Sequence, residues 1–380
     1  MRNFFSLIQL FALVMAACVP QPRADDISAE IVSTPELIEG FARADHPREF
    51  TFPADFGPHF AFQTEWWYYT GNLETEDGRH FGYELTFFRR ALLPPDEVSR
   101  RSSDWGTNHI YMGHFTITDV VAGEFHAFER FARGAAQLAG AENNPYHVWL
   151  EDWVVQQSGP NEYELFASNE GFEIRLSMTD EKGPVLQGDA GLSQKGPQPG
   201  NASYYYSQTR LLTHGELEID GETFRVDGAS WKDHEISTSA MSEGQVGWDW
   251  FSIQLDNGYD VMLYQVRRED GNVDPFSSGT LVSPDGKTAS LALRDFSVET
   301  QDTWRSPHSG AIYPMGWKVR IPSANLEIEL SPHLVDQELN LSFIYWEGAV
   351  RITGHQGGEA VGGNGYVEMT GYAQPFAGDF

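Results

Sequence analysis

The chain has 380 residues, with 55 acidic against 25 basic side chains and a formal net charge of -30 at pH 7. The electric field of this negative charge repels phosphate backbones and anionic lipid headgroups, so nucleic acid is not an expected partner. Cys18 is the single cysteine, so intramolecular disulfides and thiolate metal sites are excluded as well.

The N-terminus has the layout of a secretory signal. A basic start at Arg2 precedes an apolar stretch from Phe4 to Met15 and then Ala16-Ala17-Cys18. The stretch is shorter than the roughly 20 apolar residues that a spanning helix needs. Small residues directly before a cysteine resemble the bacterial lipobox, although Met15 stands where Leu is usual. We therefore expect residues 1–17 to be a cleaved signal and Cys18 to carry a lipid.

Residues 18–48 are rich in proline and acidic side chains and have no apolar period, which predicts a solvated tether. The remaining residues exceed the usual size of one core, so two domains are expected, over 49–225 and 226–380. A lipid anchor predicts a location in the cell envelope facing the periplasm. Val19 after the cysteine favours the outer membrane over the inner one.

Short alternating apolar runs separated by turn residues predict an all-β fold, a barrel or a sandwich. Trp66 to Leu73 and His80 to Arg90 flank Asp77-Gly78, which indicates a hairpin, and Phe251 to Leu255 and Tyr259 to Val266 flank Asp256-Asn257-Gly258 in the same way. The two hairpins resemble each other in their aromatic and arginine positions. Internal duplication and chance similarity both stay open.

Three aromatic and polar clusters are the candidate site. They are residues 59–71, Ser230 to Glu235 and Gly247 to Phe251. On a strand, Trp231, Asp233 and Glu235 share one face while Lys232 and His234 share the other. An apolar wall with a few ionisable groups is typical of a small-molecule site. The predicted pocket residues are Trp66, Trp67, Tyr68, Trp231, Trp248, Asp249 and Trp250.

Structural interpretations of these residues are equally open. The tryptophans also suit a solid core, and Asp233, His234 and Glu235 also suit a polar network or a solvated face. Arg89-Arg90 and Arg267-Arg268 are expected to pair with surplus carboxylates. A metal site is not predicted, because His109 and His114 lack a ligand spacing and no second ligand group accompanies His234. A serine hydrolase is disfavoured, since the Gly-x-Ser-x-Gly elbow is missing.

Several segments together resemble the lipocalin-like family of acyclic carotenoid 1,2-hydratase and the AttH-like secreted proteins. They are residues 64–71, 81–89, 205–210, 231–235, 247–251 and 345–350, and they occur in one order across nearly the whole mature chain. The resemblance implies two tandem lipocalin-like antiparallel β-barrel domains, a pocket for large apolar molecules and no organic cofactor. The fold alone does not fix a reaction.

The resemblance also implies roles in hydration of a carbon-carbon double bond. His234, Asp233 or Glu235 would donate a proton, Trp231 or Trp248 would stabilise the cation, and Tyr264 would orient water. Ile236 replaces a tryptophan of the hydratases, and Gln265 and Val266 leave a second expected pair incomplete. The chain is thus either an enzyme of the hydratase or isomerase class acting on a lipid-like or isoprenoid-like ligand, or a non-catalytic lipoprotein that carries apolar cargo for an ABC-type transporter. A structural envelope protein is a third interpretation.

Overall fold

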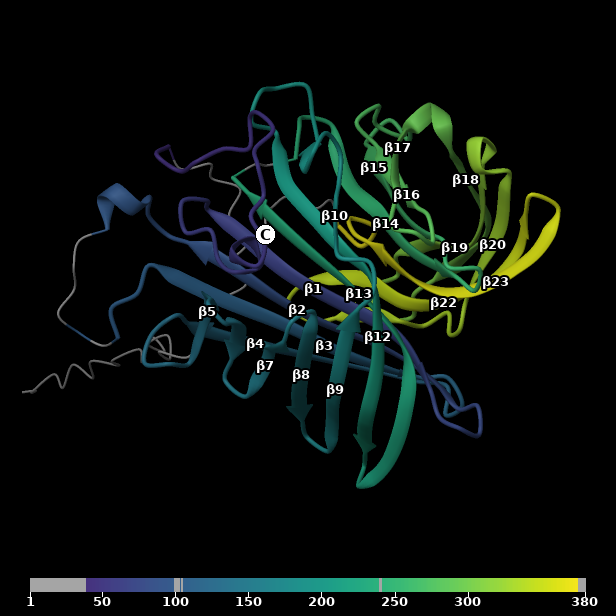
Figure 1. Ribbon diagram of the computed structural model, residues 1–380, viewed down its shortest axis with the longest axis horizontal. Helices are drawn as coiled ribbons and strands as arrows, with labels where there is room; N and C mark the ends of the chain where they lie inside the picture. The colour runs from purple at the N-terminus through teal and green to yellow at the C-terminus, as the bar shows by residue number, and fades with distance from the viewer. Residues whose placement is uncertain (1–38, 99–102, 104, 239–240, 375–380) are drawn as a thin grey trace, which may run out of the picture.

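The fold consists almost wholly of antiparallel strands. The computed structural model describes residues 39–98, 103, 105–238 and 241–374, and these form 23 strands and short 3-10 helices (Figure 1). The all-β prediction is confirmed. The predicted signal at 1–17, Cys18 and the first part of the tether lie outside the described residues. Within the described part of the chain, no helix has the length and apolar character needed to cross a membrane.

The first sheet holds the strands from the N-terminal part of the chain. They are β1 (Thr64–Glu74), β2 (His80–Ala91), β3 (His109–Asp119), β4 (Glu124–Arg133), β5 (Ala139–Asn143), β6 (Tyr146–Leu150), β7 (Trp153–Gly159), β8 (Glu162–Asn169), β9 (Phe172–Asp180), β10 (Pro184–Leu186), β11 (Leu192–Gln194), β12 (Ala202–Ile219) and β13 (Glu222–Ser237). Their order is β4-β3-β2-β1-β13-β12-β9-β8-β7-β6-β5, and β10 and β11 pair with β12.

The second sheet holds the remaining strands. They are β14 (Gln245–Leu255), β15 (Asp260–Arg268), β16 (Ser278–Val282), β17 (Thr288–Ala292), β18 (Ser297–Arg305), β19 (Ile312–Ile321), β20 (Leu326–Pro332), β21 (Glu338–Asn340), β22 (Ile344–Gln356) and β23 (Glu359–Met369). Their order is β17-β16-β15-β14-β23-β22-β20-β19-β18, and β21 pairs with β22. The 3-10 helices are η1 (Ala54–Phe56), η2 (Pro95–Glu97), η3 (Leu293–Asp295) and η4 (Pro322–Ala324).

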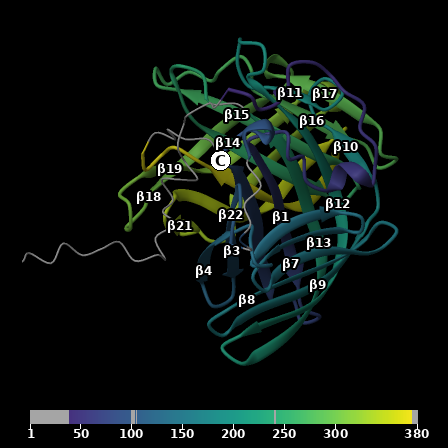
Figure 2. The ribbon, with the colours of Figure 1, turned by 90° about the vertical axis from the view of Figure 1, so that its left-hand side faces the viewer.

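The two sheets share one topology. Each begins with a hairpin whose first strand also pairs with the last strand of its sheet, β1 with β13 and β14 with β23. Both predicted hairpin turns are present, with Gly78 and Gly258 at φ values of 85° that suit glycine. Each sheet curls around its own apolar core, so two tandem β-barrels are confirmed (Figures 1 and 2). This shared topology is what the proposed duplication requires.

The chain passes from the first sheet to the second between Ser237 and Gln245. The predicted domain boundary near Val226 instead falls inside β13, which pairs with β1 and β12 of the first sheet. The Gly- and Pro-rich segment 183–200, which precedes this boundary, supplies β10 and β11, and both pair with β12. A loop-like composition does not prevent short edge pairing.

Alternation along the strands creates three buried layers. One lies inside the first barrel, one inside the second, and one where the convex faces of the two sheets meet. Contact there is close, because a Cβ added to Gly82 on β2 would lie 2.6 Å from the Cβ of Ala349 on β22. Ion pairs join the sheets as well, since the buried Asp260 binds Lys182 Nζ at 2.7 Å and Arg210 Nη2 at 2.6 Å. The sheets therefore form one packed unit with a polar and aromatic layer between them.

Candidate functional site

Strand β13 divides the predicted catalytic residues between two of these layers. Trp231, Asp233 and Glu235 face the second sheet, whereas Lys232 and His234 point into the first barrel. The period of two in a strand has this effect, as the sequence predicted. His234 therefore belongs to a different site from the two carboxylates beside it in the chain.

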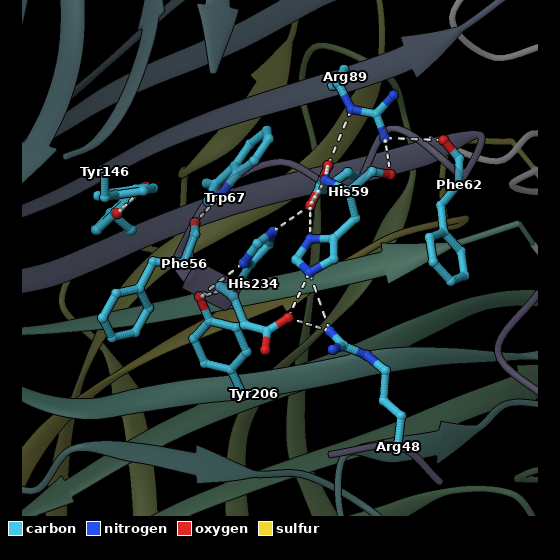
Figure 3. Close-up of polar contacts among 12 residues, drawn as sticks. Arg48, Phe56, His59, Phe62, Trp67, Arg89, Tyr146, Tyr206 and His234 are labelled. Carbon is cyan, nitrogen blue, oxygen red and sulfur yellow. Dashed lines mark hydrogen bonds and ion pairs between the residues drawn. The ribbon is translucent and has the colours of Figure 1, made fainter. Parts of the chain in front are cut away.

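His234 is the centre of a buried network inside the first barrel (Figure 3). Its Nε2 lies 2.8 Å from Glu65 Oε1 and its Nδ1 lies 2.8 Å from the Tyr206 hydroxyl. The ring stacks on Trp67, with centroids 4.9 Å apart. His59 Nδ1 also lies 2.8 Å from Glu65 Oε1. Both ring nitrogens of His234 are thus engaged by protein groups.

Charged partners surround this network. Glu65 Oε2 accepts from Arg89 Nε at 3.1 Å, and Asp55 Oδ1 accepts from His59 Nε2 at 2.8 Å and from Arg48 Nη2 at 2.7 Å. The expected pairing of Arg89 with a carboxylate is confirmed, as is the pairing of Arg267 with Asp249 and of Arg268 with Asp274.

Electrostatics fixes the charge states in the network. Burial disfavours the charge on Glu65, but hydrogen bonds from His234 and His59 hold its pKa well below the usual value. Burial likewise opposes a charge on His59, yet bonds to Asp55 and Glu65 raise its pKa to about 9. Burial lowers the pKa of His234 to about 4. A histidine that is neutral near pH 7 is a poor proton donor, so its low pKa disfavours His234 as the general acid.

Lys232 lies deeper in the same barrel. Its Nζ has no hydrogen-bond partner among the described residues and sits 4.4 to 5.8 Å from the centroids of five rings. These rings belong to Phe56, Tyr69, Tyr146, Tyr163 and Tyr206. Their faces stabilise an ammonium ion through cation–π attraction, which partly offsets its desolvation.

Five of the predicted pocket residues meet between the sheets. Trp231 and Trp250 contact edge to face at 6.1 Å, and Tyr68 and Trp250 at 5.3 Å. Trp66 and Trp248 pack against the same cluster and remain partly exposed. The other two lie elsewhere: Trp67 faces the first barrel beside His234, and Asp249 binds Arg267 at 3.1 Å and Tyr372 at 3.0 Å.

Asp233 is buried in this intersheet layer as an acceptor of several hydrogen bonds. The Tyr205 hydroxyl donates at 2.6 Å, Trp231 Nε1 donates at 2.8 Å, and Ser207 donates as well. Burial nevertheless raises the pKa of Asp233 to about 7. Glu235 differs, because it forms an ion pair with Lys195 at 2.9 Å.

Tyr264 is also in this layer, but its hydroxyl is occupied by the chain. It lies 3.0 Å from the carbonyl oxygen of Phe276 and 3.1 Å from that of Gln194. The Lys195 ammonium lies 4.4 Å from the Tyr264 ring and bridges it to Glu235. The structure thus brings Asp233, Glu235 and Tyr264 into one layer and leaves His234 out of it.

Three glutamates outside the predicted site form a carboxyl cluster in the intersheet layer. Glu347 and Glu368 are directly opposite on β22 and β23, and Glu84 approaches from β2. Glu84 and Glu347 are 0% exposed, and each keeps one oxygen without a hydrogen-bond partner among the described residues. Tyr68 donates to Glu347 Oε2 at 2.8 Å, and Trp248 Nε1 donates to the partly exposed Glu368 at 3.1 Å.

Among the described residues, no ion pair joins the carboxyl cluster to a basic side chain, and His114 is the one basic group that acts on Glu84 through its charge. Burial raises the pKa of Glu84 to about 7, and burial together with Glu84 raises that of Glu368 to about 8. Burial and the two neighbouring carboxyls raise the pKa of Glu347 well above its usual value. Like charges this close cannot all ionise, so the cluster retains protons near pH 7. In the sequence, this cluster is indicated only by acidic residues within aromatic strand segments, and that indication is weak.

A surface hollow of about 390 Å³ lies at the end of the first barrel. Its lining residues are Pro58, Phe60, Ala141, Glu142, Asn143 and Asn144. It is next to the loop that carries His59 and is separate from the intersheet rings. The donor set that suits a metal ion, His59, Glu65 and His234, also belongs to this end of the barrel.

Two lipocalin-like β-barrels in tandem, with polar groups buried inside and between them, define the class of protein. The profile of the AttH-like family matches residues 43–372, and the chain belongs to this family. A solved structure from Nitrosomonas europaea, described as an AttH, is 32% identical to the chain with a TM-score of 0.77. The match covers 87% of this chain and 100% of that one.

More distant structures share the fold. Kievitone hydratase from Nectria haematococca is 16% identical with a TM-score of 0.65, and the match covers 90% of this chain and 98% of the hydratase. The protein CghA is 14% identical with a TM-score of 0.53, over 90% of this chain and 97% of CghA. A search of curated proteins finds no match.

Proposed function

We propose that this protein is a cofactor-independent enzyme that protonates a carbon-carbon double bond of a large apolar substrate between its two sheets, as a hydratase or isomerase does. The observation that carries the proposal is the carboxyl cluster of Glu84, Glu347 and Glu368, held against aromatic rings without an ion pair to any basic side chain among the described residues. Catalytic acids need a proton at working pH, and burial supplies this condition here.

Each step has a group to perform it. Glu368 is the one partly exposed member of the cluster and accepts from the partly exposed Trp248, so we assign it the role of proton donor. Its proton passes to one alkene carbon, and the cation left on the other carbon faces the rings of Trp66, Trp248 and Tyr68. Water then bonds to the cationic carbon, and a proton from that water returns to the carboxylate. An isomerase would instead remove a proton from the adjacent carbon.

The family and fold are in line with this chemistry. Kievitone hydratase, which shares the fold, is a hydratase by name. The rival function uses the same apolar layer without proton transfer: a carrier that receives or delivers apolar cargo for an ABC-type transporter. Ile236 in place of the hydratase tryptophan favours the carrier, whereas the neutral carboxyl cluster favours the enzyme.

The test uses the full chain and lycopene, an acyclic polyene with isolated terminal double bonds, in ¹⁸O-labelled water. We expect product that carries one labelled oxygen, formed at least about 100-fold more slowly by Glu368→Gln, because a general acid contributes about 10²–10⁴-fold. Glu76→Gln, an exposed change on the β1–β2 turn, is the matched control. Lycopene bound unchanged by all three proteins would establish the carrier, and no binding would overturn both functions.

We also propose that the mature protein is anchored to a membrane, facing the periplasm, by a lipid on Cys18. Support comes from the Ala16-Ala17-Cys18 sequence after a short apolar stretch. We expect the N-terminal peptide to carry the mass of a diacylglyceryl group, and Cys18→Ser to release the protein into the soluble periplasmic fraction. Mass spectrometry of the peptide and cell fractionation check this. An unmodified Cys18 in the membrane fraction would contradict it.

A further inference from the structure

Two histidines and one glutamate converge at the end of the first barrel, apart from the carboxyl cluster. His59 precedes β1, Glu65 lies on β1, and His234 lies on the neighbouring β13. One donor atom from each, with both nitrogens 2.8 Å from Glu65 Oε1, falls in a group whose members all lie within 4.8 Å of one another. Two imidazoles and a carboxylate are a donor set that first-row transition metals prefer, whereas Mg²⁺ and Ca²⁺ prefer oxygen alone.

The far side of each imidazole is held by an acceptor. His59 Nε2 lies 2.8 Å from Asp55 Oδ1, and His234 Nδ1 lies 2.8 Å from the Tyr206 hydroxyl. When an ion replaces the proton between His234 Nε2 and Glu65, Nδ1 keeps its hydrogen and donates to that hydroxyl, which lies 3.2 Å from the carbonyl oxygen of Asp55 and donates onward. Metal-binding histidines are oriented by such outer partners, which leave the near nitrogen with a lone pair for the ion.

We propose that His59 Nδ1, His234 Nε2 and Glu65 Oε1 bind a divalent transition-metal ion of the Zn²⁺ type. Three protein ligands leave a fourth position open, as in catalytic rather than structural zinc sites. The inference is independent of the proposed function, whose acids lie between the sheets.

Access and charge limit the affinity. The His59 side chain is 17% exposed, and its chain neighbours Pro58 and Phe60 line the surface hollow, which gives an ion a route. Arg48 and Arg89 already offset the charges of Asp55 and Glu65. We therefore expect a dissociation constant on the order of micromolar rather than the much tighter binding of structural zinc sites.

The test uses the full chain without a histidine tag, treated with chelator and then titrated with Zn²⁺ by calorimetry and with Co²⁺ by visible absorption. We expect one equivalent of each ion to bind and Co²⁺ to give the ligand-field bands of a low-coordinate site. His59→Gln, which alters the most exposed ligand, should weaken binding by at least about 30-fold. His214→Gln removes an exposed histidine of β12 and should change nothing.

Two outcomes overturn the proposal: no saturable binding to the wild type, or equal binding to His59→Gln and the wild type. Circular dichroism shows whether His59→Gln has folded. Should it not fold, Asp55→Asn replaces it, because weakening the outer partner of His59 is expected to reduce affinity about 10-fold or more. Unchanged affinity in a folded Asp55→Asn would then count against the site.

Discussion

Replacement of Arg89 by methionine is expected to lower the free energy of unfolding by about 3–5 kcal/mol, since the buried Glu65 carboxylate loses its arginine partner and keeps only its histidine partners. Arg89 is 1% exposed and binds Glu65 Oε2 at 3.1 Å and the carbonyl oxygen of Phe62 at 3.0 Å. Hydrogen bonds hold Glu65 in its ionised form. Urea unfolding at neutral pH measures the loss.

Arg175→Met is the matched control for this change. Arg175 pairs with Glu173 at 2.9 Å on the surface, where its side chain is 64% exposed. Exposed pairs contribute about 1 kcal/mol or less. Equal, small losses of unfolding free energy in the two variants would show that Arg89 does not stabilise an ionised Glu65. The account of an ionised network inside the first barrel would then be wrong.

Replacing an ionisable group of the carboxyl cluster is expected to stabilise the folded protein, in contrast to the replacement of Arg89. At about pH 8, Glu347→Gln is expected to be more stable than the wild type by about 1–4 kcal/mol, the range found when buried charged groups are replaced by neutral side chains of similar volume. Glu347 is 0% exposed and its pKa is raised well above the ordinary value by burial and by Glu368 and Glu84. A neutral amide in its place removes the repulsion and keeps an acceptor for Tyr68.

The sign of the pH dependence follows from the raised pKa values. Unfolded glutamates ionise near 4.5, whereas Glu84 and Glu368 in the folded chain ionise near 7 and 8. Their contribution to stability is therefore complete below about pH 4.5 and is lost as pH rises through the folded values. The titratable groups facing the cluster are Tyr68 of β1, His114 of β3, Asp233 and Glu235 of β13, Tyr345 of β22 and Tyr366 of β23.

Urea unfolding of the wild type, Glu347→Gln and Glu76→Gln across this pH range checks the prediction. The wild-type and Glu76→Gln curves should fall together above about pH 5, and the Glu347→Gln curve should fall less. Parallel curves for all three proteins would mean that the cluster is ionised in the folded chain, which would remove the proposed acid.

Local patterns predicted the strands and their faces. The turns at Asp77-Gly78 and Asp256-Asn257-Gly258 fixed two hairpins, and the period of two placed His234 opposite Asp233. The prediction of one catalytic set that contains both His234 and Asp233 did not take this alternation into account. Whether a strand face meets a barrel interior or a second sheet depends on tertiary packing, and no local pattern contains that information.

The carboxyl cluster shows why part of the site was beyond prediction. Glu84, Glu347 and Glu368 come from both sheets, and only the register of β22 with β23 and the contact between the sheets bring them together. Their charge state depends on burial, which is likewise a property of the packed sheets. The pairing of Glu65 with His234, 169 positions apart, has the same origin.

A protonated acid between the sheets is the central claim, and infrared spectroscopy tests it most directly. The spectrum of the wild type minus that of Glu347→Gln, recorded near neutral pH, should show the C=O stretching band of a protonated carboxylic acid, shifted to lower frequency in D₂O. A difference spectrum that contains only carboxylate bands would contradict the claim, because Glu347 would then be ionised and the cluster around Glu368 would not retain its protons.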